Sequence, residues 1–190
     1  PMYDLFSSAH ETIAHLVSKE LKVRDLMKFT IARILEVNDR VNAIVSLHEE
    51  HDLLSASEVA DQVPMYRRGP LHGLPIAIKD LVDAKGLHTS QGSPIFDGHI
   101  AQLDALLVAR IRAAGAIIIG KTNTPEFGLG SHTFNPVFGT TYNPYDLSRS
   151  AGGSSGGAAV ALATGMISIA DGSDMMGSLR NPAAWNNVYG

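Results

Sequence analysis

Two serines in glycine-rich turns have the residue types and spacing for covalent chemistry. Ser154 lies in the run 152–157 (GGSSGG), and Ser178 ends the run 173–178 (SDMMGS). A serine hydroxyl is a poor nucleophile until a base accepts its proton, and a lysine kept neutral by desolvation can be that base. Lys79, which follows an apolar run, is the candidate base, although its position alone favours an ordinary surface lysine. The turn that ends in Ser178 also offers backbone N–H groups to an oxyanion.

The segment between the two serines predicts how they could meet. Residues 156–164 are small and apolar and predict a tightly packed helix of about ten residues, ended by Gly165 in the left-handed conformation. Residues 166–170 predict a short buried strand of about the same length. A helix followed by a strand of equal length would return Ser178 to the neighbourhood of Ser154, so we interpret the two serines as one site.

The rest of the chain predicts helices and strands in alternation. Ser8 and Glu11 have the spacing of a capping box for a first helix, and Asp25 is the expected start of a second helix that ends near residue 36. This order predicts an α/β fold with a parallel or mixed sheet covered by helices. The other expected elements are helices at 49–61 and 104–114, the latter with Leu106, Leu107, Val108 and Ile111 inward, and strands at 41–47, 74–78 and 116–119.

The composition of the 190-residue chain excludes several classes of function. A net charge of −4 with 18% charged residues gives no basic surface for nucleic acid. The lack of cysteine excludes thiolate metal sites and a cysteine nucleophile within this stretch, and His48 and His51 do not match a zinc-protease motif. The first residues lack a signal-peptide pattern and no apolar run reaches membrane-spanning length, so the expectation is a cytoplasmic protein without membrane or metal.

Two other motif matches compete with the serine–lysine interpretation. Residues 115–122 (GAIIIGKT) fit the phosphate-loop pattern, but the residues between the two glycines are the predicted strand itself, which leaves no loop to hold phosphates. Residues 152–156 (GGSSG) fit the nucleophile elbow of α/β-hydrolases, whose histidine follows the serine in the chain. All eight histidines precede Ser154, so that mechanism would need a histidine beyond residue 190.

Several spaced motifs, from the first predicted helix to residue 190, resemble the amidase signature family. The resemblance implies a mixed sheet with helices on both faces, and hydrolysis of carboxamides, or transfer of their ammonia, by a serine–cis-serine–lysine triad. It implies no cofactor, because a lysine and two hydroxyls supply the acid–base chemistry. The motifs are residues 73–80 (GLPIAIKD), 120–127 (GKTNTPEF), 143–144 (NP), 152–157 (GGSSGG) and 173–182 (SDMMGSLRNP).

Carried over by motif position, the resemblance implies a role for each site residue. Ser178 would be the acylated nucleophile and Lys79 the base. Ser154, held by a cis peptide bond after Gly153, would relay the proton between them. Ser131 would lie near the acyl site. The oxyanion hole would consist of the backbone N–H groups of Met175, Met176, Gly177 and Ser178.

The chain departs from the family pattern in the turn before Ser178. Met176 stands where the family has a glycine, and a positive φ there would cost energy that glycine avoids. Since a side chain does not remove a backbone N–H, our hypothesis is that the oxyanion hole is retained and that Met175 and Met176 narrow the acyl pocket. Four further polar residues are assigned structural roles: Ser155 and Asp174 would stabilise the turns, and Arg180 and Lys121 fit ion pairs at least as well as substrate contacts.

Length is the larger departure, since family members are more than twice as long. We therefore expect a single domain, truncated at its C-terminus. Residues 1–70 would form an N-terminal helical segment with one strand, and residues 71–190 the N-terminal part of the amidase signature α/β core. A fold cut there would expose apolar surface from Ile76, residues 117–119 and residues 167–169.

The predicted function is an amidase that hydrolyses a small-molecule carboxamide to the acid and ammonia or an amine, through an acyl-enzyme on Ser178. Two alternatives stay open: the glutamine-dependent amidotransferase subunit of the same family, which works on charged transfer RNA, and a non-catalytic binding module with the same fold. Trp185 and Asn186, where that subunit commonly has Phe-Cys, favour the stand-alone amidase. The substrate is not readable from the sequence, and a homodimer is left open.

Overall fold

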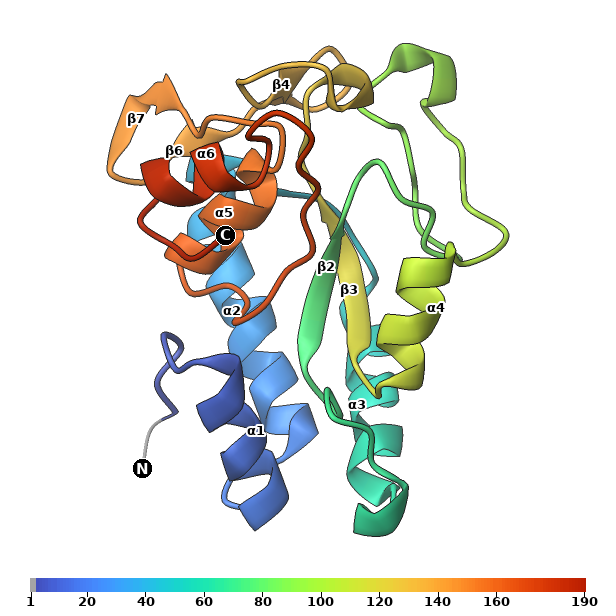
Figure 1. Ribbon diagram of the computed structural model, residues 1–190. Coiled ribbons are helices and arrows are strands. Elements are labelled where there is room, and N and C mark those ends of the chain that lie inside the picture. Colours follow the sequence, from blue (N-terminus) through green and yellow to red (C-terminus); the bar gives the residue numbers. More distant parts are fainter. Residues whose placement is uncertain (1–2) are drawn as a thin grey trace.

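The computed structural model describes residues 3–190 and is built around a three-stranded sheet in the order β1-β3-β2 (Figure 1). Strand β2 (Pro75–Lys79) is parallel to β3 (Ile117–Thr122), and β1 (Ile44–Leu47) is antiparallel to it. The predicted mixed sheet is therefore confirmed. Two small antiparallel pairs lie outside it: β4 (Phe134–Asn135) with β5 (Gly139–Thr140), and β6 (Tyr142–Asn143) with β7 (Asp146–Ser150).

Six α-helices flank the sheet in the described part of the chain. The capping box at Ser8 is confirmed, because the Ser8 N–H donates to Glu11 Oε2 at 2.8 Å and the Glu11 N–H donates to Ser8 Oγ at 3.2 Å. None of the helices within residues 3–190 combines the length and hydrophobicity that crossing a membrane requires. The helices are α1 (Ala9–Ser18), α2 (Val23–Val41), α3 (Glu50–Gln62), α4 (Leu106–Ala113), α5 (Gly156–Ala163) and α6 (Arg180–Trp185), and the 3₁₀ turns are η1 (Met65–Arg67), η2 (Pro94–Phe96) and η3 (Glu126–Gly128).

Helix α2 is longer than predicted at both ends. It begins at Val23 because Asp61, far along the chain, accepts the N–H groups of Val23 at 2.8 Å and Arg24 at 3.1 Å. It ends only where Asn42 takes the left-handed conformation, with φ of 52°. A cap supplied from a distant residue leaves no local sequence signal, so the start at Asp25 and the end near residue 36 were wrong.

The two faces of the sheet bury separate hydrophobic clusters, which confirms helices on both faces. One face, with Ala77 and Ile119, packs against α2 and α5. The other, with Ile76, Ile78 and Ile118, packs against Val108 of α4 and the N-terminal helices. Figure 1 shows α2 and α5 on one side of β2 and β3, and α4 on the other.

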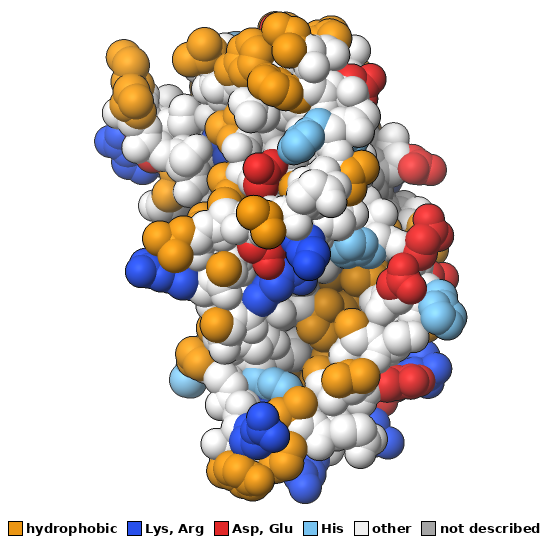
Figure 2. All heavy atoms as spheres, turned by 90° about the vertical axis from the view of Figure 1, so that its right-hand side faces the viewer, with side chains coloured by type: hydrophobic (Ala, Val, Ile, Leu, Met, Phe, Trp, Pro, Cys, Tyr) orange, Lys and Arg blue, Asp and Glu red, His pale blue; other side chains and the backbone are white. Residues whose placement is uncertain are grey.

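The predicted inward face of α4 was only partly correct. Val108 is fully buried and Ile111 packs against the second cluster, but Leu106 is 68% exposed and Leu107 is also exposed. The helix begins at Leu106, so these two leucines lie in its first turn. Figure 2 views this side of the molecule and shows hydrophobic side chains among charged ones, with a dense group at the upper end.

The expectation of exposed apolar surface on the central strands was wrong. Ile76, Ile118, Ile119 and Ile167 are buried, and Ile117 and Ile169 are partly buried, since helices cover both faces of the sheet within residues 3–190. Most exposed large apolar side chains lie instead on loops, on helix surfaces and on the small outer strands, including Leu103, Leu129, Phe134, Met175 and Met176.

The segment after α5 returns to the site without forming the predicted strand at 166–170. Gly165, with φ of 70°, follows the helix as predicted, and Met166 and Ile167 pack into the first cluster. The edge of the sheet beside this segment offers little backbone to pair with: the Lys79 N–H donates to the side chain of Asp171, at 2.7 Å, instead of to a neighbouring backbone carbonyl. Residues 166–170 thus form an irregular segment, in which Met166 and Ile167 are buried and the other three residues are partly buried.

Candidate active site

Lys79, the last residue of β2, is surrounded by three serine hydroxyls. Its side chain is 1% exposed, and Nζ donates to Ser154 Oγ at 2.7 Å, Ser155 Oγ at 2.8 Å and Ser173 Oγ at 2.9 Å. A charged lysine can donate to all three oxygens, whereas a neutral lysine can donate two hydrogens and accept one hydroxyl proton. The arrangement therefore suits both protonation states.

Burial lowers the pKa of Lys79 to about 8, while the negative charges of Asp171 and Asp174 act in the opposite direction. Its three hydrogen-bond partners are uncharged, so no direct ion pair offsets the loss of hydration. A lysine in this environment can exchange a proton near neutral pH.

Ser154 and Ser155 lie at the start of α5, where the chain runs very close to β3. The peptide bond between Gly153 and Ser154 is cis, as the family resemblance implies. A Cβ added to Gly157 would lie 2.3 Å from the Asn123 backbone nitrogen, so only glycine permits this approach. The small residues of the run 152–157 thus bring Ser154 within reach of the lysine at the end of β2.

Ser178 returns to the same place through the backbone. The Ser155 N–H donates to the Ser178 carbonyl oxygen at 2.9 Å, which confirms the predicted approach of the two glycine-rich turns. Ser178 is half-buried and, with Ser154, Ser173 and Ser131, lines a cavity of about 660 Å³. The structure therefore brings together all four serines and Lys79.

Asp174 organises the turn that precedes Ser178. Its carboxylate accepts the N–H groups of Gly177, Leu179 and Arg180, and forms an ion pair of 2.9 Å with Arg180 Nε. The Arg180 guanidinium and these N–H groups hold the pKa of the Asp174 carboxyl well below its usual range. The structural roles predicted for Asp174 and Arg180 are confirmed.

The turn places its one positive φ on Gly177, at 111°, and Met176 does not need the glycine conformation. The expected cost of a methionine at this position is therefore absent. The Gly177 N–H is occupied by Asp174 Oδ1 at 2.7 Å, so the predicted set of four oxyanion donors is corrected. Within the described chain, the N–H groups of Met175, Met176 and Ser178 have no hydrogen-bond acceptor.

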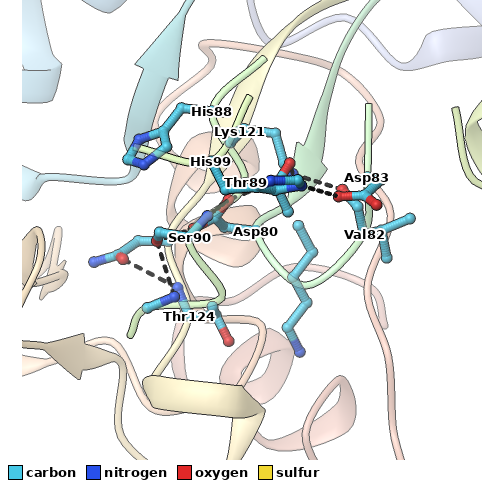
Figure 3. A network of polar contacts seen from close by, with 12 residues as sticks. Asp80, Val82, Asp83, His88, Thr89, Ser90, His99, Lys121 and Thr124 are labelled. Atoms are coloured by element: carbon cyan, nitrogen blue, oxygen red, sulfur yellow. Dashed lines mark hydrogen bonds and ion pairs between the residues drawn. The ribbon is translucent and has the colours of Figure 1, made fainter. Parts of the chain in front are cut away.

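A second buried lysine, Lys121 on β3, belongs to a separate network (Figure 3). Its Nζ lies 3.4 Å from Asp80 Oδ1 and donates to Thr89 Oγ1 at 2.9 Å and to the Val82 carbonyl oxygen. Asp80 also accepts from Ser90 Oγ at 2.6 Å. The ion pair predicted for Lys121 is confirmed, and the phosphate-loop alternative fails because the glycine-flanked residues are β3 itself.

The histidines of the described chain complete neither the nucleophile elbow of α/β-hydrolases nor a zinc site. In the part of the chain that the structure describes, Ser154 Oγ accepts a hydrogen bond from Lys79 Nζ and not from a histidine. His132, the last histidine of the chain, hydrogen-bonds Ser150 at 2.6 Å. No group of three histidine or carboxylate side chains within residues 3–190 is placed to hold a metal ion.

Two residues of this site escaped the sequence reasoning. Ser173 was seen only as the first residue of a turn, although it contributes the third hydroxyl around Lys79. Asp171 had no pattern around it, and its contact with the backbone of Lys79 joins residues 92 positions apart. A polar residue at the end of an apolar segment that leads into a glycine-rich turn is the signal that could have found Asp171.

Comparison with known proteins assigns the family. The family model described as Amidase matches residues 25–190. The chain is 43% identical over 175 residues to a glutamyl-tRNA(Gln) amidotransferase subunit from Alkaliphilus metalliredigens, an alignment that covers 92% of this chain and 36% of that protein. The first curated relatives are all of this kind, and the chain spans well under half of their length.

Solved structures agree with the sequence match. A bacterial aryl acylamidase of the amidase signature enzymes superposes with a TM-score of 0.88 at 31% identity, over 96% of this chain and 38% of that one. The peptide amidase of Stenotrophomonas maltophilia superposes with a TM-score of 0.86 at 35% identity, over 95% of this chain and 38% of that one. The motifs, the fold and these matches agree: the chain belongs to the Amidase family, the amidase signature enzymes.

Proposed function

We propose that this chain carries the acylation centre of a serine amidohydrolase, which hydrolyses a carboxamide to a carboxylic acid and ammonia or an amine. The observation that carries the proposal is the 2.7 Å hydrogen bond between Lys79 Nζ and Ser154 Oγ, beside the cavity that Ser178 also lines. The lowered pKa of Lys79, about 8, supports its role as the base. Membership of the Amidase family supports the reaction class.

The proposed acylation uses the two serines and the lysine one after another. Ser178 Oγ attacks the amide carbonyl carbon, its proton passes to Ser154 Oγ, and the Ser154 proton passes to Lys79 Nζ. The tetrahedral intermediate then collapses, the C–N bond breaks, and the leaving nitrogen takes the proton that Lys79 returns through Ser154. Attack of water on the Ser178 ester, with the same relay as base and then acid, releases the carboxylic acid and restores Ser178.

Backbone amides would stabilise the negative oxygen of that intermediate. The N–H groups of Met175, Met176 and Ser178 are the proposed donors, since each lacks an acceptor in the described chain and Gly177 donates to Asp174. Ser131, at the cavity wall, is proposed to contact the acyl part of the substrate.

The cavity wall favours a neutral, apolar acyl group. Its side chains include Leu81, Phe127, Leu129, Met175 and Met176, and its one carboxylate, Asp174, is paired with Arg180. Met176 lines this cavity and its side chain, 88% exposed, is free to contact an acyl group, so Met176→Gly should change the preference between amides of short and long acyl chains. An unchanged kcat/KM for both kinds of amide would contradict this role.

Transfer of ammonia within a larger assembly is the second candidate function. The curated relatives at 38–44% identity are glutamyl-tRNA(Gln) amidotransferase subunits, which favours it. Copurification with other subunits and hydrolysis of glutamine would support this candidate, whereas hydrolysis of simple amides by the isolated protein would support the amidase. A homodimer and a cytoplasmic location remain part of the amidase proposal, and sedimentation of the purified protein would test the homodimer.

The test of the proposed function is covalent labelling of the full-length protein by a fluorophosphonate. We expect one adduct by intact mass, lost in Ser178→Ala and kept in Ser55→Ala, which removes an exposed serine of α3. Lack of any adduct on folded protein would favour the non-catalytic binding module instead.

A further inference from the structure

Asp171 is a half-buried carboxylate whose charge acts on two buried lysines, without a direct ion pair to either in the described chain. Its Oδ1 accepts the backbone N–H of Lys79 at 2.7 Å. Its negative charge acts on both Lys79 and Lys121, and their positive charges act on it. Lys121 already has Asp80 as its ion-pair partner, whereas Lys79 has only hydroxyls. The charges of Asp171 and Asp174 both act on Lys79, and Asp171 also accepts the Lys79 backbone N–H.

The contact fixes the backbone from which the lysine side chain extends. Lys79 is the last residue of β2, and its N–H points toward the segment that follows α5 and carries Asp171. With a carboxylate as acceptor, this hydrogen bond is stronger than a neutral one. The segment that carries Asp171 also carries Ser173, whose hydroxyl accepts from Lys79 Nζ at 2.9 Å, so one short stretch holds both ends of the lysine.

The charge matters because the proposed reaction creates an ammonium in a desolvated place. When Lys79 accepts the serine proton, the new positive charge has little water around it, and a nearby carboxylate lowers the energy of that state. We propose that Asp171 is a positioning residue for the base: it holds the backbone of Lys79 and stabilises the ammonium that forms during acylation. This inference rests on the proposed function.

The other charged groups around Lys79 do not replace Asp171. Asp174, from the same segment, is held by Arg180 at 2.9 Å. Asp80, the neighbour of Lys79 in sequence, is paired with Lys121 of β3 at 3.4 Å. The start of α5 presents only the hydroxyls of Ser154 and Ser155. Burial raises the pKa of Asp171, and the change of the pH profile when Asp171 is neutralised reports whether it is charged at the working pH.

The experiment measures the rate constant of fluorophosphonate labelling of Ser178 against pH, in the full-length protein. Asp171→Asn keeps an oxygen for the Lys79 N–H and removes the charge. We expect the midpoint of the acid limb to fall by about half to one pH unit, because the ammonium is less favoured. We also expect the plateau rate to fall by about three- to tenfold, because the ammonium formed in the reaction is less stabilised.

Two further variants separate charge from position. Asp171→Leu removes the charge and the acceptor, so its midpoint should move as in Asp171→Asn and its plateau should fall further. Asp83→Asn is the matched control: it removes a half-exposed carboxylate near Lys121, next to His99, and should leave midpoint and plateau as in the wild type. Asp171→Ser supplies a second neutral variant if Asp171→Asn does not fold.

A pH profile of the neutral variants that overlays the wild type, or a plateau loss without a shifted midpoint, would overturn the charge role. The two proposals fail differently. If Lys79→Ala were labelled as fast as the wild type, the proposed function itself would be wrong; if Lys79→Ala were inactive and Asp171→Asn unchanged, only the role of Asp171 would be wrong.

Discussion

Lys79 and Lys121 occupy neighbouring strands, are buried to the same degree and have different partners. Lys79, at the end of β2, contacts three serine hydroxyls, whereas Lys121, on β3, has a carboxylate, a threonine hydroxyl and a backbone carbonyl. Burial lowers the pKa of both lysines. The direct carboxylate partner of Lys121 offsets that effect for the charged form, whereas within the described residues no carboxylate forms an ion pair with Lys79 Nζ.

The comparison shows that burial of a lysine does not by itself make a reactive group. A lysine paired with a carboxylate stays an ammonium and has no lone pair to accept a proton. A lysine whose ammonium contacts only hydroxyls can lose its proton without breaking a direct ion pair. Because of these different partners, Lys121 stabilises the fold, whereas Lys79 is available for acid–base chemistry.

The largest expected effect is the loss of labelling in Lys79→Met. Methionine keeps the length of the side chain and removes the base, so the fluorophosphonate labelling rate should fall by about three orders of magnitude. Stability should change little, because an unpaired buried lysine contributes little to folding. Lys85→Met, at an exposed lysine, is the control. A labelling rate within about tenfold of the wild type would mean that Lys79 is not the base.

Lys121→Met should have the opposite pair of effects: a loss of stability with little change in labelling. It leaves Asp80 buried without its cation, and breaking such a pair costs about 3–5 kcal/mol of the free energy of unfolding. The labelling rate of the molecules that remain folded should stay close to the wild type. Denaturant unfolding measures the first effect, and the double variant Asp80→Asn/Lys121→Met should recover part of the loss. A stable Lys121→Met protein with no labelling would place Lys121 in the chemistry.

The pH dependence should follow Lys79 alone. Only the neutral lysine accepts a proton, so the labelling rate should rise about tenfold per pH unit below the lysine pKa and level off above about pH 8. Lys121 should add no second limb. Rates measured from about pH 6 to 10 on the wild type test this, and a rate that fell with rising pH would show that the protonated lysine is the active form.

Much of the site could be predicted because its residues stand in local motifs. The two glycine-rich runs and the strand that ends in Lys79 are each a continuous stretch of sequence. The small apolar residues of 156–164 and the glycine after them likewise predict α5 and its end. The contacts that depend on distant residues could not be predicted. Asp61 accepts a backbone N–H at the start of α2, and Asp171 accepts the backbone N–H of Lys79 at the end of β2. Each of these contacts joins residues far apart in the chain. The same holds for the missing strand at 166–170. The apolar pattern predicts a strand that would pair with the sheet, but the Lys79 N–H of β2 donates to the side chain of Asp171 instead.

The finest test removes one hydroxyl from each lysine. Ser173→Ala takes a hydroxyl 2.9 Å from Lys79 Nζ, and Thr89→Val takes one 2.9 Å from Lys121 Nζ. For Lys121, which pairs with Asp80, the lost hydrogen bond should lower the free energy of unfolding by about 1.5–3 kcal/mol and leave labelling unchanged. For Lys79, two hydroxyls remain and the neutral form needs fewer acceptors, so stability should fall by less than about 1 kcal/mol while labelling falls about fivefold. Loss of a hydroxyl beside a structural lysine should lower stability, and loss of one beside a working base should lower the labelling rate. Equal stability losses with unchanged labelling in both variants would therefore mean that the two lysines differ only in position.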